Sequence, residues 1–123
     1  MSMSDTQIVA EDYVELWNES DGAQRRAAIE RLWSQHAAHY VGLREAHGHE
    51  ALALRVTGSH EKNVRDGGYR FRAVKDAKRL RNAVTFHWEM VEPETGRVAA
   101  TGLEMLLLDA DQKIRIDYQF IVS

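Results

Sequence analysis

Glu104 is the residue of this sequence with the clearest capacity for chemistry. In an extended strand it shares a face with Gly102, Leu106 and Leu108, because side chains alternate between the two faces of a strand. That face should point toward the core, where an ionised carboxylate is costly unless it is paired or takes up a proton. We therefore expect a raised pKa for Glu104, which suits a general acid, a hydrogen-bond donor to an oxyanion, or a base near neutrality. The alternative is a structural carboxylate satisfied by one tyrosine or arginine.

Tyr13 and Tyr118 are candidate partners for this carboxyl group. Tyr13 falls on the apolar stripe of an expected first helix, and Tyr118 on the face of the last strand that we predict to point inward. Buried phenols need a hydrogen-bond partner, and Glu104 could serve both. A tyrosine and a protonated carboxyl group in an apolar pocket can together stabilise an enolate-like oxygen. Core packing is the alternative role for each tyrosine.

Five of the six histidines lie between positions 36 and 60. His36, His39, His47 and His49 have a spacing that suggests metal ligation, but they span an expected helix end and a loop, with no acidic ligand fixed nearby. We therefore predict no metal site and no cofactor. His39, or alternatively His36, is the candidate base of a pocket.

Composition excludes several classes of protein. The 123 residues contain no cysteine, which excludes a disulfide framework, a thiolate nucleophile and a zinc ribbon. The net charge of −3 argues against nucleic-acid binding, and the basic residues between positions 65 and 81 alternate with apolar ones, as on a solvated strand edge.

The polar N-terminus does not look like a secretory signal, and the longest nearly apolar run, 98–108, is too short to cross a bilayer. We expect a cytoplasmic protein with no membrane contact.

Helical periodicity dominates the first half of the chain. Ser4 and Gln7 have the spacing of a capping box at the start of a first helix. A second helix is expected after residues 20–22, with Ile29, Leu32 and Trp33 on its apolar stripe and His36 next on the same face. A third is expected from near Gly48 to the turn at 66–68.

From residue 69 the apolar period changes to two, which predicts strands. They cover about 69–74, 84–91, 97–108 and 114–122, and in the last one we expect Ile114, Ile116, Tyr118, Phe120 and Val122 to share a face. Three helices followed by long strands indicate one α+β domain over 1–123, with the helices packed on one face of a curved antiparallel sheet.

The stretch 103–108 departs from one-sided alternation. Leu103, Met105 and Leu107 are apolar on the face that should point away from the helices. The simplest cover for that face is a second copy of the chain, so we predict a homodimer through the outer sheet face. The alternative is that these are scattered surface residues.

Three short stretches resemble those of the NTF2-like (SnoaL-like) superfamily. Positions 13–17, Tyr-Val-Glu-Leu-Trp, are similar to the first-helix segment of ketosteroid isomerases, with Tyr13 where their oxyanion-hole tyrosine lies. Positions 48–52, Gly-His-Glu-Ala-Leu, are similar to the start of the third helix of the family. Positions 102–104, 108–109 and 113–114 resemble its final hairpin, with Glu104 where the second, protonated oxyanion-hole acid would lie.

The resemblance implies a conical NTF2-like (cystatin-like) barrel with a deep apolar pocket. Members of this superfamily include isomerases, polyketide cyclases, dehydratases, epoxide hydrolases and simple ligand binders, so the fold does not determine the activity. The sequence departs from the isomerases at one place: their catalytic aspartate would fall on Val41, and no carboxylate follows until Glu45. His39 or Tyr40 could take its place, or a different reaction could be catalysed.

These observations predict an enzyme that acts on a small, largely apolar molecule by cofactor-free acid–base chemistry. Glu104 would donate or accept the proton, Tyr13 and Tyr118 would bind an oxygen, and His39 would be the base. The pocket walls are expected to be Trp17, Trp33, Tyr40, Phe86, Trp88, Met90 and Phe120. The alternative is a non-catalytic domain that binds a small ligand or dimerises.

Overall fold

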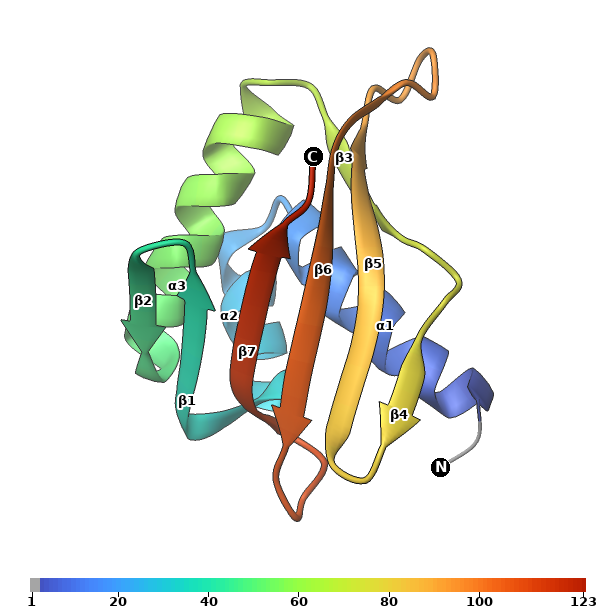
Figure 1. Ribbon diagram of the computed structural model, residues 1–123. Helices are drawn as coiled ribbons and strands as arrows, with labels where there is room; N and C mark the ends of the chain where they lie inside the picture. Colours follow the sequence, from blue (N-terminus) through green and yellow to red (C-terminus); the bar gives the residue numbers. More distant parts are fainter. Residues whose placement is uncertain (1–2) are drawn as a thin grey trace.

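The computed structural model describes residues 3–123 as three helices on one face of a seven-stranded sheet (Figure 1). The helices are α1 (Met3–Asn18), α2 (Gly22–Leu32) and α3 (Gly48–Ser59), and α3 continues into the π-helical segment η1 (His60–Arg65). The strands are β1 (Trp33–Val41), β2 (Arg44–His47), β3 (Arg70–Ala73), β4 (Lys78–Leu80), β5 (Ala83–Val91), β6 (Val98–Leu108) and β7 (Ile114–Ile121). This is the α+β arrangement that the sequence predicts.

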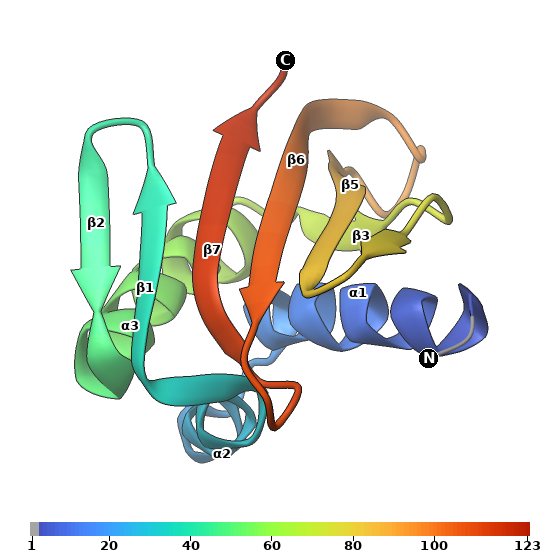
Figure 2. The same cartoon turned by 60° about the horizontal axis from the view of Figure 1, so that its bottom comes forward.

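The sheet has the order β2-β1-β7-β6-β5-β3, and β4 also pairs with β5. It is mixed rather than antiparallel throughout, because β1 runs parallel to β7. Figure 2 shows the sheet curving around the helices, with α1 passing along its β5 and β3 side. The centre of the sheet, β5 to β7, therefore carries the side chains that the helices cover.

The second and third helices begin where the sequence predicts, whereas the end of the second helix differs from the prediction. In α2 the side chain of Asp21 accepts hydrogen bonds from the main-chain nitrogens of residues 23 and 24, at 2.8 and 3.2 Å, which caps the helix. The third helix begins at Gly48, as predicted, and with η1 it ends before the 66–68 turn. The predicted capping box depends on the Ser4 side chain, which lies outside the side chains that the structure describes.

The end of α2 corrects one prediction. The helix stops at Leu32, and Trp33 begins β1, so Trp33 and His36 do not continue the helical stripe. The segment 33–41 forms a strand because it pairs with β7, a partner far away in the sequence that local periodicity does not reveal.

A β-bulge in β7 corrects a second prediction. Leu108 of β6 pairs with Ile114 and Leu107 pairs with Ile116, which leaves Arg115 as an extra residue. The bulge reverses the alternation, so Asp117 faces the helices and is fully buried, whereas Tyr118 lies beside Met105 on the outer face. Ile116, Tyr118 and Phe120 do share a face, but it is the outer one, whereas Ile114 points inward and Val122 lies beyond the end of the strand.

The core lies between the inner sheet face and the helices. Its fully buried side chains come from α1, α2, α3, β1, β5 and β6, and include Leu16, Ile29, Trp33, Leu52, Val84, Phe86 and Leu106. Across residues 3–123, no helix is long and apolar enough to cross a membrane.

Candidate active site

A continuous hydrogen-bonded network runs through the core from β5 to β1. The Trp88 indole nitrogen donates to Glu104 Oε1 at 2.8 Å, and Glu104 Oε2 lies 3.1 Å from the Tyr13 hydroxyl. That hydroxyl is 2.5 Å from Asp117 Oδ2, and the same oxygen is 2.7 Å from His39 Nδ1. Tyr13, Glu104, Asp117 and His39 are each at most 2% exposed, so water does not screen their interactions.

The geometry determines how protons are distributed. Burial, and then the charge of Asp117, raise the pKa of Glu104 well above its usual value of 4.5. Burial and both carboxyl groups raise the pKa of Tyr13 above 10.0, so it remains a phenol. A phenol has one hydrogen. Because its contact with Asp117 is the shorter of the two, we infer that the Tyr13 hydroxyl donates this hydrogen to Asp117. A protonated Glu104 then supplies the hydrogen for the contact with Tyr13.

Strand pairing explains why these residues meet. Glu104 lies at the middle of β6, between β5 and β7, and His39 of β1 is directly opposite Asp117 of β7. Tyr13 reaches the network from the buried face of α1, where its ring contacts Phe86 with centroids 5.5 Å apart.

Gly102 makes the contact between Trp88 and Glu104 possible. The two residues Trp88 and Gly102 are opposite each other in β5 and β6, and the indole lies over the glycine. A β-carbon at position 102 would be 2.1 Å from Trp88 Cζ2, which is too close for two carbon atoms. The absence of a side chain therefore allows the indole N–H to reach the carboxyl group.

A cavity of about 490 Å³ opens beside the network. Glu104, Tyr13 and Gln119 contribute polar side chains to its lining, and Trp17, Phe71, Trp88 and Met90 are among its apolar walls. Its rim includes the exposed Leu54 and three cations, Arg44, Arg55 and Lys62. The volume is within the range of small-molecule sites.

Several polar atoms at the site have no partner within residues 3–123. They are Asp117 Oδ1, His39 Nε2, Gln119 Oε1, Arg55 Nε and the indole nitrogen of Trp17. Buried polar atoms without partners are uncommon, and they are the atoms that a bound molecule or water can satisfy. His39 and Asp117 do not line the cavity, so they can act on its contents through Tyr13 and Glu104 rather than directly.

The structure brings three of the four predicted catalytic side chains together: Tyr13, Glu104 and His39. Tyr118 is not among them, because on the outer face its ring stacks on Tyr40 with centroids 5.5 Å apart. Sequence reasoning missed Asp117. An acidic residue within the largely apolar stretch 114–121 could have indicated a buried carboxylate. Regular alternation along that strand, however, places Asp117 on the solvent side.

The predicted wall residues divide into three groups. Trp17, Trp88 and Met90 line the cavity. Trp33 and Phe86 are buried in the core behind Tyr13, and both rings contact it. Tyr40 lies on the outer face, and Phe120 is 52% exposed, so neither faces the cavity.

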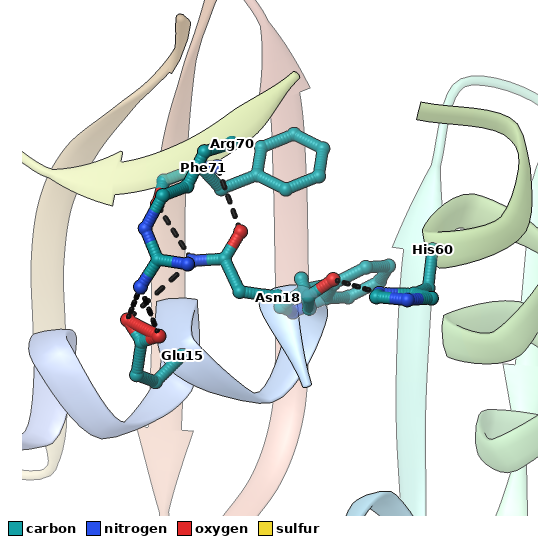
Figure 3. Close-up of polar contacts among 6 residues, drawn as sticks. Glu15, Asn18, His60, Arg70 and Phe71 are labelled. Atoms are coloured by element: carbon teal, nitrogen blue, oxygen red, sulfur yellow. Dashed lines mark hydrogen bonds and ion pairs between the residues drawn. The ribbon is translucent and has the colours of Figure 1, made fainter. Parts of the chain in front are cut away.

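The walls of the cavity are held by a clamp between α1 and the edge strand β3 (Figure 3). The Asn18 side chain donates to the Phe71 carbonyl at 2.7 Å and accepts from the Phe71 N–H at 2.8 Å, as a neighbouring strand would. Arg70 donates to Glu15 at 2.7 Å on the exposed side. These contacts fix Phe71 relative to the end of α1.

A second contact positions Trp17. His60 Nδ1 lies 3.2 Å from the Trp17 carbonyl and joins η1 to the end of α1. Figure 3 labels His60 and marks its contact by a dashed line. On the other side the Arg55 guanidinium lies over the Trp17 ring, 5.1 Å from its centroid. The indole is thus held by contacts from η1 and α3.

The four histidines considered as metal ligands are dispersed. His36 is exposed, His47 pairs with Glu45 at 3.3 Å, and His49 Nε2 lies 3.0 Å from two carbonyl oxygens of β1. In the described part of the chain, no three His, Asp or Glu side chains are grouped as metal ligands would be.

Comparison with known proteins relates the chain to solved structures. No protein-family model and no curated sequence gives a significant match. A proposed isomerase of the SnoaL-like family from Agrobacterium tumefaciens has a TM-score of 0.88 at 22% identity, over 98% of this chain and 99% of that one. An NTF2-like protein of unknown function from Exiguobacterium has a TM-score of 0.71 at 17% identity, over 94% and 98%. A proposed polyketide cyclase from Sinorhizobium meliloti has a TM-score of 0.68 at 9% identity, over 97% and 99%.

These likenesses confirm the fold predicted from the sequence. The chain has the α+β cone of NTF2-like, SnoaL-like and cystatin-like proteins. At such identities the likeness shows the fold and leaves the activity to be argued from the site.

Proposed function

We propose that this protein is an enzyme that activates an oxygen atom of a small, largely apolar substrate by general-acid catalysis, without a cofactor. The observation that carries the proposal is a carboxyl group with a raised pKa, next to a phenol, at the wall of a cavity. Isomerisation, cyclisation and hydrolysis can all begin with this step.

In the proposed mechanism, Glu104 donates to a carbonyl or epoxide oxygen the proton that it otherwise directs to Tyr13, and the Tyr13 hydroxyl, whose own hydrogen goes to Asp117, positions the Glu104 carboxyl group. Donors that are already in place at such an oxygen contribute strongly, because a dry site does not have to reorganise. Asp117 and His39 act through Tyr13: Asp117 orients the hydroxyl, and His39 holds Asp117 at 2.7 Å. His39 is thus a positioning residue in this proposal rather than a base that touches substrate.

The test is turnover of a panel of enolisable ketones, epoxides and polyketide mimics. Loss of a general acid should lower kcat by about 100-fold or more in Glu104→Gln. Tyr13→Phe should lower kcat less, because the general acid Glu104 remains. Glu94→Gln, in the exposed turn between β5 and β6, is the matched control. An unchanged rate in Glu104→Gln would refute the assignment.

A second candidate function is a small-ligand-binding domain without catalysis. The observation in its favour is that both Glu104 oxygens already have partners in Trp88 and Tyr13. This candidate predicts that ligands raise Tm without turnover, and that Glu104→Gln changes ligand affinity only.

We also propose that the outer sheet face pairs with a second copy of the chain. Leu103, Met105 and Leu107 lie there next to Tyr118 and Phe120, on the side of the sheet that faces the viewer in Figure 1 and that no helix covers. Large exposed apolar patches on folded proteins often mark interfaces. Sedimentation velocity tests the proposal, and a monomer at micromolar concentration would contradict it.

A further inference from the structure

Three cations surround the opening of the cavity without an acidic partner. Arg44 begins β2, Arg55 lies on α3 and Lys62 on η1, and all three line the cavity. None of them has an ion pair with a carboxylate in the described part of the chain, although arginines elsewhere, such as Arg65 and Arg70, do. Glu104 is the one acidic side chain of the lining.

Arg55 is held in place by stacking on an aromatic ring. Its guanidinium lies over the Trp17 ring, and its Nε is buried without a hydrogen-bond partner. A guanidinium fixed by stacking keeps its planar fork of donors oriented and loses little freedom when it binds an anion. Its position over a cavity wall makes those donors available to whatever occupies the cavity.

Arg44 and Arg55 also repel each other. The pKa of Arg55 is lowered, first by burial and then by the charge of Arg44. A pair of like charges at a partly buried position is unfavourable, and a negative group between them would remove that cost. Carboxylates and phosphates match the geometry of arginine in addition to its charge.

The apolar walls indicate the rest of the occupant. Trp17, Phe71, Trp88 and Met90 are apolar residues of the cavity lining, and the Trp88 indole contacts Glu104. A ligand that contacts both these walls and the cations is amphipathic, with an apolar body and one anionic end.

We propose that the cavity binds a small apolar acid, with its carboxylate or phosphate group between Arg44 and Arg55 and its apolar body against Trp17, Phe71 and Trp88. The inference rests on the proposed function for the site and specifies its substrate class. The anionic end would fix the molecule at the rim, so that an oxygen of its apolar body is presented to Glu104.

Matched aromatic probes test the charge preference. Binding of 2-naphthoate, its neutral amide 2-naphthamide, and 2-naphthyl phosphate is measured by calorimetry and by quenching of tryptophan fluorescence. Hydrogen bonds to charged groups predict that at least one anion binds about 10- to 100-fold more tightly than the amide. The naphthoate and phosphate arms distinguish the two anionic groups. Raising the salt concentration should weaken only the anions.

Variants assign the preference to the rim. Arg55→Gln and Arg44→Gln should each remove most of the preference for the anion and leave amide binding nearly unchanged. Arg55→Lys should retain part of it. Arg65→Gln, on η1 but outside the cavity lining, is the control and should bind as wild type does.

Two results would overturn the inference: equal binding of anion and amide by the wild-type protein, or no binding of any probe at millimolar concentration. The proposed catalytic function fails separately. In that case Glu104→Gln leaves turnover unchanged or no substrate turns over, while the anion preference and its loss in Arg55→Gln persist.

Discussion

The proton on Glu104 should make the stability of the protein depend on pH in a way that one substitution removes. The pKa of Glu104 is raised in the folded state by burial and by Asp117, whereas in the unfolded chain it returns to about 4.5. Between these two pKa values the folded state binds one more proton than the unfolded state. The stabilisation is therefore complete below about pH 4.5 and is lost as pH rises through the folded-state pKa.

The magnitude follows from linkage. One proton of difference changes the free energy of unfolding by about 1.4 kcal/mol per pH unit, so stability should fall with that limiting slope above pH 5. Glu104→Gln cannot ionise and should lack this contribution. The titrating groups outside the network are the same in both proteins, so the difference between the two curves reports the Glu104 carboxyl group together with its coupling to Asp117.

Urea unfolding at pH 5, 6, 7 and 8 measures both curves. Glu94→Gln, at an exposed turn, should follow the wild-type curve. Parallel curves for wild type and Glu104→Gln over this range would mean that Glu104 is ionised in the folded protein. That result would refute the proton assignment and the general-acid role derived from it.

Three further substitutions test other parts of the structure. In Gly102→Ala the Trp88 indole must move by about 1.3 Å to reach ordinary contact with the new methyl group. Overpacking and the broken hydrogen bond to Glu104 should lower the free energy of unfolding by about 2–4 kcal/mol. Wild-type stability would show that the indole is mobile. Asn18→Leu should cost about 1–3 kcal/mol and speed amide exchange of Phe71, with unchanged exchange arguing against the clamp. Tyr118→Lys should shift sedimentation toward the monomer, and an unaffected dimer would exclude this face as the interface.

The central strands were predictable because their alternation is regular. Glu104, Leu106 and Leu108 are all buried as the period of two requires, and so are Phe86 and Trp88 on the neighbouring strand. A buried Glu104 near Tyr13 could therefore be inferred from residue order alone. The resemblance to the NTF2-like superfamily predicted the cone-shaped sheet against which Tyr13 packs beside Glu104.

The remaining features depend on contacts that local patterns do not contain. His39 faces inward because β1 pairs with β7 across more than 70 residues of sequence, and its mixed polar and apolar pattern resembles a helix end as much as a strand. The cationic rim combines residues from β2, α3 and η1, which only the folded chain brings together.

The β-bulge in β7 means that the side chains which face the site depend on the local geometry of the strand as well as on its residue types. Arg115 is itself exposed and touches none of the network, yet the bulge that it forms determines that position 117, and not position 118, faces the helices. Deleting Arg115 would leave Ile116 opposite Leu107 and Asp117 opposite Leu106 in a regular strand, so the carboxylate would stay inside. A bulge flattened with Arg115 retained would instead turn Tyr118 inward and Asp117 outward, although every amino acid is unchanged.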